Sequence, residues 1–254
     1  MVDMAITLWL QNTWLYDIFY NALIFFSHIG TAGSIGIAVI ILTIIVRVLL
    51  APFSYKAIIH QVIQKKLEPA RKKIQQDYKD DKKMQAEKMM ELMRENKTNP
   101  FSSCLLTLVQ IPIILVLYTV FLTGLTIQPD ILYSFVPIPD ALNLNFLGLN
   151  LGEKSILLGI LTGLVQYVQI KFSPVMQENK SAVVKPEDQD SQALMMQSMQ
   201  KSMKFTLPVM ITVFASIVPA AVALYWLTTN LFTLGQELYI TKKLAREEVL
   251  TKVS

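Results

Sequence analysis

Basic residues are confined to blocks of this chain, and these blocks alternate with long apolar stretches. Residues 1–46 contain no Lys or Arg, whereas residues 51–103 contain twelve. Hydrophobic residues make up 53% of the chain. A soluble protein spreads charge over its surface, so this segregation indicates a polytopic membrane protein. The apolar composition also excludes a disordered chain, and the single cysteine, Cys104, excludes a disulfide-stapled secreted domain.

Apolar stretches of suitable length predict five membrane spans, since a spanning helix needs roughly 20 mostly apolar residues. Pro52 is expected to close the first span, and a tight turn at Pro219 is expected to separate the last two. The fourth span is short, because its rise of about 21 Å is less than the hydrocarbon thickness of about 30 Å. We expect it to thin the bilayer locally. The predicted spans are 33–52, 104–123, 155–172, 205–218 and 220–240.

The charge of the connecting segments predicts their orientation, because Lys and Arg accumulate on the cytoplasmic side. Segments 53–103, 173–204 and 241–254 are basic, whereas 1–32 and 124–154 hold almost no basic residues. The three basic segments are therefore predicted to be cytoplasmic, and the other two external. This topology is that of a multi-pass membrane protein with its N-terminus outside and its C-terminus in the cytoplasm. The lack of a transit-like, Arg-rich leader favours a bacterial plasma membrane over an organelle.

Within the external segment, residues 9–29 mix aromatic and polar side chains. The pattern favours an amphipathic helix lying in the outer membrane interface. Asp17 and Asn21 argue against the alternative, an additional span. No cleavable signal peptide is evident, because the start of the chain lacks a basic region.

The basic segment after the first span is predicted to form a helical hairpin. Residues 53–96 contain no glycine, and their apolar residues recur at helical spacing except in the polar run 77–81. We expect two antiparallel helices with a polar tip at this run. Their charges suit either a solvated helix surface or a docking arm for anionic lipid headgroups, ribosomal RNA or a nascent chain. The sequence leaves both interpretations open.

The predicted fold is therefore all-α, with five transmembrane helices around a hydrophilic groove, a cytoplasmic helical hairpin and an interfacial N-terminal helix. The histidines, His28 and His60, fall on opposite sides of the membrane in this topology. No metal-ligand cluster, phosphate-binding loop or nucleophile motif is evident. We expect neither a metal nor another cofactor, and no covalent catalysis.

Arg47 is a basic residue inside a predicted span, where a central charge costs roughly 2.5 to 3.5 kcal/mol. One interpretation is that its guanidinium snorkels to the cytosolic headgroups near Pro52. The other is a hydrated groove within the bundle, because polar side chains in lipid would leave hydrogen-bonding groups unsatisfied. Simple interhelical hydrogen bonding is an alternative for the glutamines. The predicted groove residues are Arg47, Thr43, Gln110, Gln166, Gln169 and Asn230.

Over about residues 15–242, several motifs resemble the YidC family of membrane protein insertases. They are Ile-Ile-Val-Arg-Val-Leu-Leu-Ala-Pro at 44–52, Leu-Glu-Pro at 67–69, Asn-Pro-Phe-Ser-Ser-Cys-Leu at 99–105, Val-Gln-Ile-Pro at 109–112, Leu-Tyr at 117–118, Gln-Ile-Lys at 169–171, and Pro-Ala-Ala-Val-Ala-Leu-Tyr-Trp at 219–226 with Asn230. Ser102, Ser103 and Leu106 stand where the family usually has Gly and Pro, and Ala221 replaces a usual Gly. Nothing resembles the large outer domain of the long bacterial forms, so we expect the short form.

This resemblance implies a protein that inserts and helps to fold transmembrane segments from the cytosolic side, without nucleotide hydrolysis and without enzymatic chemistry. Tyr225 and Trp226 resemble the family's substrate-contacting positions, although an aromatic residue in a membrane helix more often serves packing. The implied partners are nascent membrane proteins, anionic lipids and, weakly or transiently, the ribosome. The Sec translocon is a candidate partner, and DNA is not expected to be one.

Two other functions are compatible with the same residues. A channel or small-solute transporter would use the polar cavity as a pathway continuous to the outside. A purely structural assembly factor for other membrane complexes would tolerate the loss of Arg47.

Overall fold

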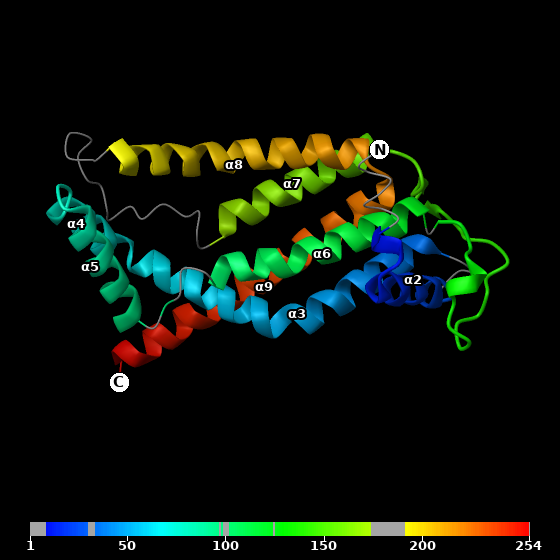
Figure 1. Cartoon of the computed structure of the whole chain (residues 1–254), viewed down its shortest axis with the longest axis horizontal. Coiled ribbons are helices and arrows are strands. Elements are labelled where there is room, and N and C mark those ends of the chain that lie inside the picture. Colours follow the sequence, from blue (N-terminus) through cyan, green and yellow to red (C-terminus); the bar gives the residue numbers. More distant parts are fainter. Residues whose placement is uncertain are drawn as a thin grey trace. The chain divides into compact units, whose positions relative to one another are not determined.

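The computed structural model describes residues 9–29, 34–96, 98, 102–123, 125–173 and 191–253, so parts of the predicted segments 1–32 and 173–204 lie outside the described residues. These residues are mostly helical (Figure 1). The elements are α2 (Trp14–Ser27), α3 (Ile35–Lys66), α4 (Glu68–Asp77), α5 (Lys82–Glu95), α6 (Ser102–Thr123), the 3-10 turn η1 (Pro129–Ile131), β1 (Asn145–Phe146), β2 (Leu149–Asn150), α7 (Ile156–Phe172), α8 (Ser191–Ile217) and α9 (Ala220–Val253).

The chain divides into two compact units, and each long helix contributes to both. The first unit holds Met1–Leu50, Thr107–Gln166 and Pro208–Phe232. The second holds Ala51–Leu106, Tyr167–Leu207 and Thr233–Ser254.

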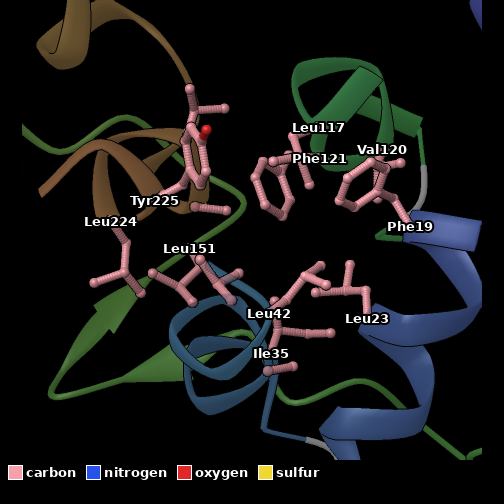
Figure 2. Close-up of a cluster of buried hydrophobic side chains, with 14 of the residues drawn as sticks. Phe19, Leu23, Ile35, Leu42, Leu117, Val120, Phe121, Leu151, Leu224 and Tyr225 are labelled. Carbon is pink, nitrogen blue, oxygen red and sulfur yellow. The ribbon is translucent and has the colours of Figure 1, made fainter. Parts of the chain in front are cut away.

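The core of the first unit is built from apolar side chains of α2, α3, α6 and α9, together with Leu151 from the loop before α7 (Figure 2). Small residues let α9 pack closely there, since Ala220, Ala221 and Ala223 are fully buried. The labelled members of this core are Phe19, Leu23, Ile35, Leu42, Leu117, Val120, Phe121, Leu151, Leu224 and Tyr225.

Helix α2 is tied to the loop after α6 by its polar side chains. The Tyr20 hydroxyl accepts a hydrogen bond from the Gln128 backbone N–H at 2.7 Å. The Asn21 side chain accepts one from the Tyr133 N–H at 2.6 Å and donates one to the Ile131 carbonyl at 2.8 Å. Asn21 is therefore buried and satisfied within the protein.

The exposed side of α2 carries large apolar side chains, among them Trp14, which is 72% exposed, and Ile18 and Phe25. An exposed aromatic and aliphatic surface of this kind suits the membrane interface. The interfacial position of this helix stays a prediction.

The loop before α7 contains a short β-hairpin that the sequence did not predict, because strands of this length show no alternating pattern. β1 and β2 pair antiparallel through Asn145↔Asn150 and Phe146↔Leu149. Leu147 and Gly148 at the turn both have positive φ, as tight hairpins require. Gly36 at the start of α3 allows β1 to approach, because a Cβ there would overlap the Phe146 ring.

Helix α3 does not end at Pro52, as the sequence predicted, but continues to Lys66 with the proline inside it. The proline removes one backbone hydrogen bond, and polar side chains support the neighbouring turn. Ser54 Oγ and Gln236 Nε2 both donate to the Ala51 carbonyl, at 3.1 and 3.2 Å. The helix is therefore stabilised locally by a residue from α9, which a local pattern cannot reveal.

The predicted hairpin begins later than expected, because residues 53–66 belong to α3. Its two helices are present after Lys66, and its cytoplasmic position stays a prediction. α4 and α5 are in contact and are separated by the polar residues 78–81 (Figure 1). Asp81 caps α5, because its side chain accepts hydrogen bonds from the N–H groups of Lys83 and Met84. Gln85 Nε2 also donates to the Gln75 carbonyl at 3.0 Å, which joins the two helices.

The prediction that 173–204 is a loop is wrong for residues 191–204, which belong to α8. α8 has 27 residues and a length of about 40 Å. Its apolar part alone is short, Lys204–Ile217. The polar residues before it form a helix of low hydropathy, which a search for apolar runs overlooks. The predicted turn at Pro219 is confirmed between α8 and α9, and α9 extends through the predicted tail to Val253.

Close packing of α7 against α8 in the first unit depends on two glycines. A Cβ at Gly159 would lie 2.9 Å from the Ser216 backbone nitrogen, and one at Gly163 would lie 3.1 Å from the Pro208 carbonyl oxygen. Small residues four apart on facing helices are a common means of close helix association in membranes.

The outer faces of these helices are apolar, which suits lipid better than water. Soluble monomers rarely expose large contiguous apolar patches. The exposed residues include Ile156, Leu157, Ile160, Leu161 and Leu164 on α7, and Val209, Val213 and Ile217 on α8. By length and composition, α3 is the one helix among the described residues that can cross a membrane, and shorter apolar helices occur at Gln110–Thr123, Ile156–Phe172 and Lys204–Ile217.

Candidate functional site

A hydrogen-bonded cluster in the first unit joins three helices around the hydroxyl of Tyr225. Gln110 of α6 donates from Nε2 to this hydroxyl at 2.7 Å. The Arg47 side chain of α3 is hydrogen-bonded to the same hydroxyl. Tyr225 is only 3% exposed, whereas Arg47 and Gln110 are half-buried. The tertiary structure therefore brings together three of the residues that the sequence singled out.

Among the residues that the structure describes, no acidic side chain pairs with the Arg47 guanidinium. The ion pairs Lys72–Glu68 and Lys88–Glu91 lie in the hairpin helices. A guanidinium has five N–H donors in a rigid fork and pairs well with a carboxylate. Tyr225 provides one neutral acceptor, so the site retains donor capacity and positive charge for an anionic group.

Thr43 lies one turn before Arg47 on the same face of α3. Its hydroxyl donates to the Val39 carbonyl at 2.6 Å, and the residue is buried. The hydroxyl is therefore satisfied by its own helix, and the contribution of Thr43 to a hydrated surface stays a prediction.

The remaining predicted residues of the first unit lie in different surroundings. Asn230 is 4% exposed, and its Nδ2 has no hydrogen-bond partner in the part of the chain that the structure describes. Gln166 is half-buried on α7. The Trp226 ring packs edge-on against Phe214 of α8, with centroids 5.5 Å apart. Trp226 thus has a packing contact, and its predicted contact with a substrate stays a prediction.

Gln169 belongs to the second unit, where it is hydrogen-bonded to Glu237 of α9 together with Ser173. Glu237 is buried, and its Oε2 has no hydrogen-bond partner among the described residues. The sequence reasoning missed this carboxylate. The signal was present, because Glu237 is the sole acidic residue within the predicted spans, and an intramembrane charge is a functional candidate by default.

In the described parts of the chain, no group of three or more His, Cys, Asp or Glu residues is arranged to hold a metal ion. The Arg47 guanidinium, the Gln110 amide and the Tyr225 hydroxyl themselves offer hydrogen bonds and one positive charge.

Comparison with known proteins identifies the family. The family model described as "60Kd inner membrane protein" matches residues 25–247. The membrane protein insertases YidC of Francisella tularensis subsp. novicida (strain U112) and subsp. tularensis (strain WY96-3418) are each 32% identical over 247 residues, which covers 95% of this chain and 39% of the relative. The chain spans about two fifths of the length of these relatives. The match over most of its length shows that this chain belongs to the 60Kd inner membrane protein family, as its motifs predicted.

Proposed function

We propose that this protein inserts transmembrane segments into the bacterial plasma membrane from the cytosolic side, without nucleotide hydrolysis. The observation that carries the proposal is the Arg47 guanidinium. It is held against Tyr225 at a junction of three helices and has no carboxylate partner among the described residues. The name of the relatives, membrane protein insertase, supports the same function.

Charge attraction provides the physical basis of the proposed mechanism. The short outer tail of a client often carries carboxylates, and each meets a barrier of roughly 2.5 to 3.5 kcal/mol in the bilayer. Arg47 attracts this tail, while Gln110 and water hydrate it. The membrane potential adds roughly 2.3 kcal/mol per charge per 100 mV for an anion moving outward. The apolar segment then passes into lipid along α6 and α9, next to Trp226.

The proposed topology has five spans, with the 124–154 loop outside and the α4–α5 hairpin in the cytoplasm. The exposed apolar faces of α7 and α8 support membrane contact along these helices. We propose nascent membrane proteins as clients. The ribosome, the Sec translocon and anionic lipids are proposed as further partners, with the ribosome and lipids meeting the basic hairpin.

Insertion of a client with an acidic tail into reconstituted vesicles tests the proposal. Arg47→Ala should reduce insertion about tenfold, which corresponds to a loss of about 1.4 kcal/mol. Arg47→Lys should largely preserve it, because the positive charge remains. Arg246→Ala, which removes an exposed arginine of α9 outside the predicted span, is the matched control.

Equal insertion by Arg47→Ala and wild type would contradict the role of the arginine and favour headgroup snorkelling. Flux of small solutes through the same vesicles, in the absence of a client, would instead favour a channel or transporter.

A further inference from the structure

An open pocket of about 600 Å³ lies in the first unit, between the end of α6, the loop before α7 and the turn between α8 and α9. It is distinct from the Arg47 cluster, with which it shares no lining residue. The lining combines charged and apolar side chains. The lining residues that matter here are Tyr118, Leu122, Glu153, Lys154, Ile217 and Val218.

The charged side of the pocket is held in place by the backbone. The Ala220 N–H donates to the Glu153 carbonyl at 2.7 Å, and Lys154 forms a β-bridge with Pro219. Asn150 Nδ2 also donates to Glu153 Oε1 at 2.7 Å, which orients the carboxylate. An anion and a cation are therefore presented side by side on a fixed loop, at the ends of apolar helices.

The apolar side of the pocket continues along these helices. Ile217 is 57% exposed, and Val213 and Val209 are exposed at successive turns of the same α8 face. On α6, Leu122 is 44% exposed, and Leu115 is exposed two turns before it. The pocket thus changes from charged to apolar over a short distance, as a membrane surface does.

We propose that this pocket binds a phospholipid with a zwitterionic, primary-amine headgroup, of the phosphatidylethanolamine class. The Lys154 ammonium pairs with the lipid phosphate, and the Glu153 carboxylate pairs with the lipid ammonium. The acyl chains lie on Leu122 and Ile217. An anionic lipid without an amine satisfies Lys154 alone and meets repulsion from Glu153, so the pair of charges discriminates between the two headgroups. This inference requires membrane residence and is independent of the insertase mechanism.

Native mass spectrometry of the detergent-purified full chain tests the proposal. The protein is mixed with equimolar phosphatidylethanolamine and phosphatidylglycerol, and the lipids that stay bound are counted. Wild type should retain phosphatidylethanolamine up to about fivefold more than phosphatidylglycerol, because fivefold is the upper end of the range for one exposed ion pair. Soluble glycerophosphoethanolamine at the same concentration should not displace the lipid, because it lacks acyl chains.

Three variants separate the contributions, and all concern exposed side chains. Glu153→Gln should abolish the preference between the two lipids while phosphatidylglycerol stays bound. Lys154→Gln should lower the binding of both lipids. Lys171→Gln, at the opposite end of α7, should behave as wild type. Equal retention of both lipids by wild type, an unchanged preference in Glu153→Gln, or displacement by the soluble headgroup would each overturn the proposal.

Discussion

Gln110 and Tyr225 lie 115 residues apart in the chain, and their side chains form a 2.7 Å hydrogen bond between α6 and α9. Arg47 of α3 binds the same tyrosine hydroxyl. The hydroxyl is therefore a common acceptor for a neutral amide and a guanidinium. This arrangement places the cation at a helix junction of the first unit.

Tyr225→Phe should lower the free energy of unfolding by about 1 to 3 kcal/mol, because Gln110 and Arg47 both lose a buried acceptor. Thermal unfolding in detergent measures this loss of stability. Tyr133→Phe, at an exposed tyrosine of the loop after α6, is the control. A double-mutant cycle of Gln110→Ala with Tyr225→Phe should be non-additive. Additive effects would show that the hydrogen bond contributes nothing to stability.

Gly159→Ala should destabilise the packing of α7 on α8. The added Cβ meets the Ser216 backbone at 2.9 Å, and backbone cannot move aside as a side chain can, so we expect a cost of about 1 to 3 kcal/mol. The matched control is Gly235→Ala in α9, where the structure has open space around a Cβ. That change should stabilise its helix by about 0.5 to 1 kcal/mol. If Gly159→Ala and Gly235→Ala shifted the melting temperature in the same direction, the close contact between Gly159 and the Ser216 backbone would be contradicted.

Glu237→Ala should destabilise the second unit by about 1 to 3 kcal/mol, because Gln169 and Ser173 lose a buried hydrogen-bond partner. Glu237→Gln keeps a side-chain acceptor and should cost less. Glu95→Ala, at an exposed acid of α5, should have no measurable effect. Thermal unfolding of the three variants provides the comparison. Equal losses of stability in Glu237→Ala and Glu95→Ala would show that Glu237 does not stabilise the second unit.

A cysteine at Gln110 tests the proposed hydrated surface and the topology together. In a Cys104→Ala background, Gln110→Cys should react with a membrane-impermeant thiol reagent from the cytosolic side only. A cysteine at exposed Leu147 of the β-hairpin should react from the outer side only. Labelling is measured in intact cells and inverted vesicles. Protection of position 110 from both sides would argue for a dry junction.

Local patterns predicted those elements whose signals lie in consecutive residues. The helices α6 and α7, the α4–α5 hairpin and the turn at Pro219 follow from apolar runs, helical spacing and proline. The end of α3 was mispredicted, because donors from Ser54 and Gln236 support the chain next to Pro52. The start of α8 was missed, because residues 191–204 are polar, and β1 and β2 were missed because each has two residues.

By itself, the sequence determined that this is a membrane protein of its family, since alternating charge and apolar blocks and ordered motifs are properties of the chain alone. It also singled out Arg47, Gln110 and Tyr225. The tertiary structure decided that Arg47 and Gln110 both form hydrogen bonds with the Tyr225 hydroxyl. It also decided that Gln169 is hydrogen-bonded to Glu237 in the second unit. Helix packing is the reason, because contacts between residues far apart in the chain depend on which faces meet, and a linear pattern does not specify this.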